Sequence, residues 1–485
     1  TPDQAGVMIT QHRGASALAL LSAALVALAA APAAPAAQVG VVADVTWGQP
    51  REDVDRELEL LRKAGVRWIR ANVNWAGLEP DAKGDLNEWL LAEYDYAVER
   101  ALASGFEVLM PIADGVPYWA SADPAKRVDD AGARRWEVTY RPARAADFGD
   151  VVRFVVARYA PKGVRVFQIW NEPNHPRFWP SGPNAAEYVP LLRAGYEAAK
   201  EADPGATVLL GGLSKSDFYY LEDVYRLGGG AYFDAVAVQP YTYGVDPTAS
   251  WKGVHDWEDP DRISVNAFPA IREIRRSMVA FGDAHKQVWL TEFGYSTTTK
   301  DGGVSPARQA AFLTKAYRYV ERLPWVEALF WYAARNSPFH GDRDEYEARF
   351  GLLTSDFEPK PSYAALRAYA LGPAAGKVEL RRASQRLVRR GGRAFARVGL
   401  RGSVAVGSGL VSRSAGVLAA ERRRVVVQRL RGGEWVAVDR VRTDSLGAFR
   451  ANVLARGPST SFRAVVRHAD LSVRSRVVRV RLRRP

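Results

Sequence analysis

Residues 164–173 read VRVFQIWNEP, in which apolar side chains dominate up to Trp170 and polar ones follow at Asn171 and Glu172. A short apolar run of this kind is typical of a strand that is buried on both faces of a parallel sheet. Residues 185–202 follow, with apolar side chains three and four positions apart, which predicts a helix. The two segments together form one strand–helix unit.

The same unit recurs on both sides of this stretch. The apolar runs occupy 38–45, 66–73, 106–113, 164–170, 206–213, 233–241, 287–295 and 326–334. The amphipathic stretches occupy 53–64, 89–104, 146–159, 185–202, 217–227, 269–281, 306–322 and 361–371. Eight such units over residues 38–372 predict an α/β fold, a (β/α)8 TIM barrel.

The pattern changes at the linker LGPAAGK (371–377). Beyond it the helical period is lost, and short runs alternate with period two between glycine-containing turns, as in VRSRVVRVRL at 473–482. Residues 377–485 therefore predict a small all-β, immunoglobulin-like sandwich.

The net charge of +13 is divided unequally between these two regions. Residues 377–485 hold 27 Lys and Arg against 6 Asp and Glu, a net +21, and the preceding chain holds 40 against 48, a net −8. The arginines of the tail have three interpretations: solvated strand faces, a pad that binds an anionic cell-envelope polymer, or a nucleic-acid surface. We do not expect the tail to bind nucleic acid. Residues 1–37 resemble a secretion signal, as described below, and the tail has few aromatic residues on which bases could stack.

Composition excludes several classes of protein. The chain is 47% hydrophobic and 25% charged, which is typical of a globular protein rather than a disordered or polytopic membrane one. It has no cysteine, so disulfides, thiol catalysis and cysteine-bound metals are excluded. Its 6 histidines are not paired at metal-ligand spacing, and we expect no metal and no cofactor.

Residues 1–37 contain His12 and Arg13, then an alanine- and leucine-rich run that ends in small residues near 36–37. This order is typical of a secretory signal peptide, whereas a membrane anchor needs about 20 apolar residues. We expect a secreted protein, extracellular or associated with the cell wall.

Two glutamates stand where a barrel carries its functional groups, at the carboxyl ends of strands. Glu172 follows the fourth apolar run and Glu292 lies at the end of the seventh, so the two carboxylates face each other across the barrel mouth. Glycoside cleavage needs such a pair, one acid to protonate the leaving oxygen and one carboxylate to attack the anomeric carbon. Either glutamate could instead serve only as the partner of an arginine or of a helix N-terminus.

The motifs W-N-E-P at 170–173 and L-T-E-F-G at 290–294 resemble the signature pair of the clan A glycoside hydrolases, and most of all those of families 39 and 5. The resemblance covers about residues 38–371. It implies a retaining (β/α)8 enzyme with Glu172 as acid/base and Glu292 as nucleophile, and with Asn171 binding the sugar 2-hydroxyl.

The same resemblance implies that Arg70 lies beside the nucleophile, that Tyr241 hydrogen-bonds it, and that Trp331 is a platform for a sugar ring. Arg70 could instead be an ion-pair arginine of the barrel interior, and Tyr241 and Trp331 could be packing residues. Trp119 is a further candidate wall of the cleft, because sugar faces pack on aromatic rings, although tryptophans also fill cores. Gln239 departs from the pattern, since many relatives carry a histidine two residues before the tyrosine. An amide can still bind substrate, but it cannot titrate.

These observations predict a secreted retaining glycoside hydrolase that cleaves O-glycosidic, expected β-linked, bonds of a poly- or oligosaccharide by double displacement, and acts as a monomer. The alternative is a carbohydrate-binding or cell-envelope protein that keeps the same barrel but has little turnover. Two ionisable groups with opposed protonation favour the enzyme, because a binding cleft does not need them.

Overall fold

A computed structural model describes the chain from residue 37 to residue 481. The described ranges are 37–46, 48–113, 115–123, 140–249, 264–337, 343–371, 375–390, 393–406, 424–443, 448–456, 459–468 and 471–481. The predicted signal segment, apart from Ala37, lies outside the described residues.

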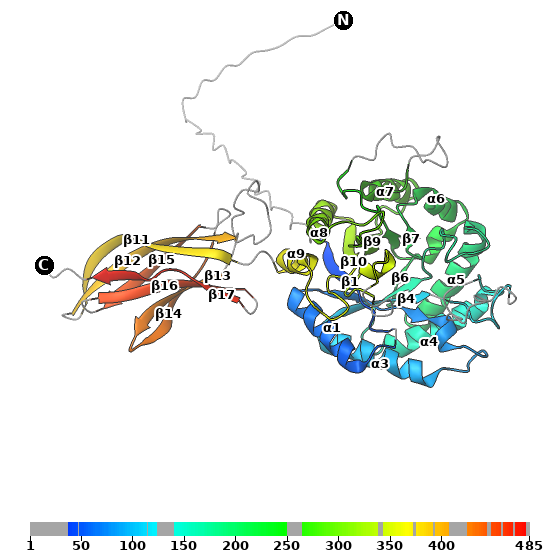
Figure 1. Cartoon of the computed structure of the whole chain (residues 1–485), viewed down its shortest axis with the longest axis horizontal. Helices are drawn as coiled ribbons and strands as arrows, with labels where there is room; N and C mark the ends of the chain where they lie inside the picture. The colour runs from blue at the N-terminus through cyan, green and yellow to red at the C-terminus, as the bar shows by residue number, and fades with distance from the viewer. Residues whose placement is uncertain are drawn as a thin grey trace, which may run out of the picture. The chain divides into compact units, whose positions relative to one another are not determined.

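The first part of the chain forms a parallel sheet that curls into a barrel, consistent with a (β/α)8 fold (Figure 1). Its strands follow the order β6-β5-β4-β2-β1-β10-β9-β8-β7, with β3 paired to β4. They are β1 (Gln38–Val42), β2 (Trp68–Arg70), β3 (Val73–Asn74), β4 (Glu107–Ala113), β5 (Val166–Ile169), β6 (Thr207–Leu209), β7 (Leu213–Ser214), β8 (Val236–Gln239), β9 (Val288–Phe293) and β10 (Val326–Trp331).

The sheet closes through a single stretch of chain. β6 and β7 are two pieces of residues 207–214, one at each end of the strand order. Parallel bridges join Leu209 to Ala235 on one side and Asn171 to Gly212 on the other. Both edges of the sheet therefore meet in this stretch, which leaves no open edge there.

Helices surround the strands in Figure 1. They are α1 (Arg51–Ala64), α2 (Trp75–Leu78), α3 (Glu88–Ala103), α4 (Ala145–Tyr159), α5 (Ala185–Ala202), α6 (Phe218–Arg226), α7 (Ile271–Ala280), α8 (Pro306–Val320) and α9 (Pro361–Ala370), with short 3-10 turns at Gly229–Tyr232, Phe268–Ala270 and Glu347–Arg349. The ends of the predicted helical stretches agree with eight of these helices to within two residues; only α2 was not anticipated.

Local chemistry explains where these helices begin and end. In α1, Glu52 and Asp53 stand in the first turn and Arg62 and Lys63 in the last, which complements the helix dipole. Gly65 then ends the helix in the left-handed region, at φ 81°.

Two apolar cores lie on the two sides of the strands. Inside the barrel, side chains from alternate positions pack together, among them Trp68, Trp289, Ala328 and Phe330. The intervening positions, such as Leu329, belong to the larger core between strands and helices. This alternation follows from the two-residue period of a strand, and it decides which residues can reach the barrel mouth.

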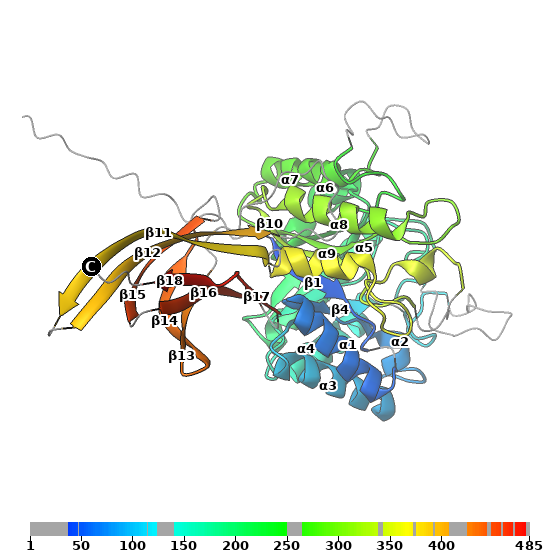
Figure 2. The same cartoon turned by 60° about the vertical axis from the view of Figure 1, so that its left-hand side comes forward.

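The tail forms two antiparallel sheets, one of order β11-β12-β15 and one of order β14-β13-β16-β17, with β18 paired to β16 (Figure 2). The strands are β11 (Ala375–Arg390), β12 (Arg393–Val406), β13 (Arg424–Arg431), β14 (Glu434–Arg442), β15 (Ala448–Arg456), β16 (Ser459–His468), β17 (Leu471–Arg474) and β18 (Val478–Arg481). Val398 and Phe449 of the first sheet share one apolar cluster with Val427 and Phe462 of the second. Two sheets with a common core could form a β-sandwich.

Among the helices that the structure describes, none combines the length and the apolar character needed to cross a bilayer.

We expect Gly40→Ala to destabilise the barrel. A Cβ at position 40 would come within 2.5 Å of the Phe330 ring, so the added methyl overpacks the barrel interior and costs about 1–3 kcal/mol of unfolding free energy. Urea unfolding followed by circular dichroism measures this. Phe330→Leu in the same chain makes room and is expected to recover part of the loss; a double variant whose losses simply add would contradict the contact.

Candidate active site

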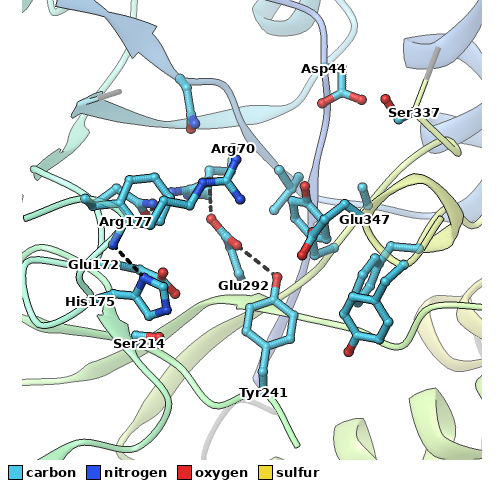
Figure 3. Close-up of a pocket in the computed structure, with 18 of the residues that line it drawn as sticks. Asp44, Arg70, Glu172, His175, Arg177, Ser214, Tyr241, Glu292, Ser337 and Glu347 are labelled. Atoms are coloured by element: carbon cyan, nitrogen blue, oxygen red, sulfur yellow. Dashed lines mark hydrogen bonds and ion pairs between the residues drawn. The ribbon is translucent and has the colours of Figure 1, made fainter. Parts of the chain in front are cut away.

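Glu292 lies near the end of β9 and is held by three donors, Arg70 at the end of β2 and Gln239 and Tyr241 at the end of β8; Figure 3 draws the contacts of Arg70 and Tyr241. The Arg70 guanidinium Nη1 lies 2.7 Å from Glu292 Oε1, with the arginine side chain 1% exposed. The Tyr241 hydroxyl donates to Oε2 at 2.9 Å, and the Gln239 amide donates to Oε1 at 3.0 Å. A buried cation and two neutral donors all stabilise the ionised carboxylate.

Asn171 belongs to the same network. Its Oδ1 accepts from Arg70 Nη2 at 3.0 Å and from Gln239 Nε2 at 2.8 Å. Because the side-chain oxygen is used twice, the amide nitrogen is the group left to donate to a ligand. The expected neighbours of Glu292, namely Arg70 and Tyr241, are therefore in place.

Glu172 stands in a different environment. The backbone turns sharply after β5, with φ 76° at Trp170 and φ 43° at Glu172, and the Glu172 N–H donates to the Gly212 carbonyl at 2.9 Å. Left-handed φ values at residues other than glycine are uncommon and cost energy, about 1–3 kcal/mol each, so surrounding contacts must hold this turn. The turn brings the Glu172 carboxyl to the cavity that Glu292 also lines.

Burial first, and then the negative charge of Glu292, raise the pKa of Glu172 to about 8. A hydrogen bond with Ser214 and the charges of Arg70 and Arg177 oppose this shift. At neutral pH Glu172 is therefore predominantly protonated, and it can donate a proton.

Both glutamates line one cavity of about 340 Å³, which is within the ~300–1,000 Å³ typical of ligand sites. Several lining residues were not predicted; Ser214 lies in β7, and the others come from loops at the carboxyl ends of five further strands. The residues not predicted are Asp44, Asn72, His175, Arg177, Ser214, Tyr243, Tyr332, Arg335, Ser337, Tyr346 and Glu347. Only their position after a barrel strand could have marked them as candidates.

The expectation that Trp331 stacks on a sugar is wrong. Trp331 is fully buried and packs against Tyr295 and Phe293 in the core between strands and helices. Its neighbour Tyr332 lines the cavity instead, with its ring near that of Tyr241. Successive residues of a strand point to opposite faces, so an error of one residue in register moves the side chain to the other core.

The expectation that Trp119 forms a cleft wall is also not supported by the geometry. Trp119 packs edge-on against the buried Trp75, and its indole N–H donates to the Glu79 carbonyl at 2.9 Å. It does not line the cavity.

Gln239 does not line the cavity, so the prediction that it binds substrate is wrong. Its side chain is fully buried, and its amide donates to both Asn171 and Glu292 from the side away from the cavity.

Within the described ranges, no three His, Asp or Glu side chains are grouped as ligands for a metal ion.

The arrangement therefore pairs one protonated and one ionised carboxyl at the mouth of a barrel. A proton donor and a nucleophile of this kind are the two groups that glycoside cleavage requires.

Comparisons with known proteins agree with this chemistry. The sequence model of the cellulase family, glycosyl hydrolase family 5, matches residues 30–336, which is more than half of the chain. A search of curated protein sequences gives no significant match.

Solved structures share the fold at low sequence identity. A family 39 glycoside hydrolase from Bacteroides cellulosilyticus WH2 has TM-score 0.53 at 20% identity, covering 86% of this chain and 81% of that one. The GH5_18 enzyme from Streptomyces cattleya, in complex with GlcNAc, has TM-score 0.54 at 17% identity, covering 70% and 80%.

The family model, the barrel and the paired glutamates agree, and the chain belongs to the cellulase family, glycosyl hydrolase family 5, of the clan A glycoside hydrolases, and is a glycosidase.

Proposed function

We propose that this glycosidase is a retaining enzyme that cleaves β-linked poly- or oligosaccharides by double displacement. The observation that carries the proposal is the contrast between the two glutamates. Arg70, Tyr241 and Gln239 stabilise an ionised Glu292, while burial beside that charge keeps Glu172 protonated. The β-linkage is supported by two similar structures, an exo-β-1,4-mannosidase and a GH5_18 variant bound to Manβ1-4GlcNAc.

In the first step, the Glu172 carboxyl gives its proton to the glycosidic oxygen as the bond from that oxygen to the anomeric carbon breaks. The Glu292 carboxylate forms a bond to the same carbon, and the leaving sugar departs with the proton. In the second step, Glu172, now ionised, takes a proton from water; the resulting hydroxyl bonds to the anomeric carbon and releases Glu292.

The neighbours of Glu292 keep its attacking oxygens in place. Tyr241 and Arg70 bind different oxygens of the carboxylate, which fixes its orientation, and Asn171 directs its free amide toward the sugar. Tyr332 offers an aromatic face in the cavity, the role expected of Trp331. Positioning of this kind lowers the entropic cost of reaching the transition state.

For the rest of the chain we propose secretion and an immunoglobulin-like tail that binds an anionic cell-envelope polymer. The signal-like residues 1–37 and the net +21 of residues 377–485 support this. In the three-stranded sheet, Arg381, Arg401 and Arg450 lie directly opposite one another on β11, β12 and β15, and all three are exposed. Like charges in register destabilise a sheet, and a bound polyanion would relieve that repulsion.

Glu292→Gln tests the mechanism. The amide cannot attack the anomeric carbon, so we expect hydrolysis of an aryl β-glycoside panel to fall by at least about 10³-fold, the scale of losing a covalent nucleophile. Glu172→Ala should lose activity too, and added azide should restore it on activated aryl glycosides, giving the β-glycosyl azide. Unchanged hydrolysis by Glu292→Gln would contradict the mechanism, and a parent inactive on the whole panel would favour a carbohydrate-binding protein.

The pH profile of kcat/KM tests the protonation of Glu172. Because the first step needs the protonated acid and its pKa is raised to about 8, activity should persist through neutrality and fall as pH rises above about 8. The Ser214 hydrogen bond lowers this pKa, so Ser214→Ala should move the basic limb to higher pH. A basic limb between pH 4 and 5 would show that Glu172 is not buried as described.

Elution of the full-length protein from immobilised polygalacturonate tests the tail. We expect retention that falls steeply with salt, because bound arginines displace counterions, and elution at lower salt when Arg381, Arg401 and Arg450 are all changed to Gln. The matched control changes three exposed barrel arginines, Arg193, Arg226 and Arg308, to Gln. Equal effects of the two triple variants, or retention that does not depend on salt, would argue against binding of an anionic polymer by the tail.

A further inference from the structure

The cavity is electrically asymmetric about Glu292. Figure 3 shows Glu172, His175 and Arg177 on one side of this carboxylate and Asp44 and Glu347 on the other. The first group follows β5, and the second comes from the loops after β1 and β10. The two ends of a substrate that lies across the cavity therefore meet fields of opposite sign.

The basic side is built on a short, well-connected turn. The His175 N–H donates to the Glu172 carbonyl at 2.9 Å, and the Arg177 N–H donates to His175 Nδ1 at 3.2 Å. With Nδ1 as an acceptor, the proton of neutral His175 lies on Nε2, which is therefore a donor. Burial, followed by the charges of Lys215 and Arg177, lowers the pKa of His175 and favours this neutral form.

Arg177 is the exposed cation of this turn. Its guanidinium lies over the Phe178 ring, 5.6 Å from the centroid, which limits the directions that it can take. Among the described residues no carboxylate forms an ion pair with it, whereas Arg70 and Arg335 are paired with Glu292 and Asp53. A guanidinium at a cavity wall that forms no ion pair can bind a carboxylate through two parallel N–H···O hydrogen bonds.

The opposite side disfavours an anion. The Asp44 carboxyl lines the cavity, and burial raises its pKa to about 6 against the opposing charge of Arg335, so it is mostly ionised at neutral pH. Glu347 adds a second acidic group there. An anionic sugar unit would be repelled from this wall and attracted to the other.

The chemistry decides which part of the substrate meets which wall. Glu172 protonates the oxygen of the leaving group, so the leaving sugar lies on the side of Glu172, next to His175 and Arg177. The sugar that bonds to Glu292 extends toward Asp44. This assignment rests on the function proposed above.

We propose that Arg177, with His175, recognises a carboxylate on the leaving-group sugar, so that the substrate is an acidic polysaccharide or oligosaccharide with a uronic acid on the reducing side of the cleaved bond. Arg177 determines specificity and takes no part in proton transfer. An arginine-rich tail that binds anionic polymers would hold the enzyme on the same class of material.

Recognition of a carboxylate by Arg177 is tested with two aryl β-glycosides. Both carry the sugar that the parent hydrolyses fastest in the aryl β-glycoside panel. One has a 4-carboxyphenyl leaving group and the other has the matching methyl ester. The aglycones are similar in shape and differ in charge. The parent should prefer the carboxylate, and Arg177→Gln should lower kcat/KM on it about tenfold, as expected for a charge-assisted hydrogen bond, with less than about a twofold change on the ester. Arg177→Lys should retain a partial preference, and Arg193→Gln should leave both rates unchanged.

The rates are compared well below pH 8, because loss of Arg177 also removes a charge that lowers the pKa of Glu172. Equal losses on the two glycosides, or a parent without preference for the carboxylate, would overturn the proposal. A calorimetric titration with free glucuronate, and with glucose as its neutral match, gives a readout that does not depend on turnover. If the parent hydrolyses no glycoside, the function proposed above fails, but the titration still tests the inference. Glucuronate binding by the parent that weakens in Arg177→Gln supports the inference. The absence of glucuronate binding overturns it.

Discussion

A guanidinium that is removed from water needs a carboxylate partner, because an unpaired buried charge costs several kcal/mol. Arg70 at the end of β2 is such a group, and Glu292 on β9 is its partner at 2.7 Å. The same guanidinium also reaches Asn171 after β5, and Gln239 on β8 closes the network from behind. Four strands of the barrel are thus joined at the site by one set of polar contacts, and the loss of any member would leave another buried and unsatisfied.

This network also makes two chemically identical side chains different. Glu292 is surrounded by donors that favour its charge, and that charge in turn disfavours ionisation of Glu172, which burial has already made costly. Glu172 is therefore the carboxyl of the pair that holds a proton at neutral pH. The asymmetry continues outward, with Arg177 beside the acid and Asp44 on the far wall.

Much of the barrel could be predicted because its signals are local. Apolar runs and helical periods mark the strands and helices, and the polar residues that end the runs mark the carboxyl edge, where Glu172 and Glu292 lie. The errors came from side-chain direction. Trp331 and Tyr332 are neighbours in the chain, yet one fills the outer core and the other lines the cavity. Trp119 follows a strand as expected but turns toward Trp75 and the Glu79 carbonyl, a contact across 40 residues.

The sequence by itself determined the order of the elements, the division of charge between an acidic barrel and an arginine-rich tail, and the position of two glutamates at the ends of strands, since composition and periodicity belong to each segment alone. Tertiary structure decided the protonation of Glu172, the burial of Gln239 and the opposed charges of the cavity walls. These properties depend on desolvation and on charges brought together from strands far apart in the chain. Neither exists until the barrel closes and excludes water from its mouth.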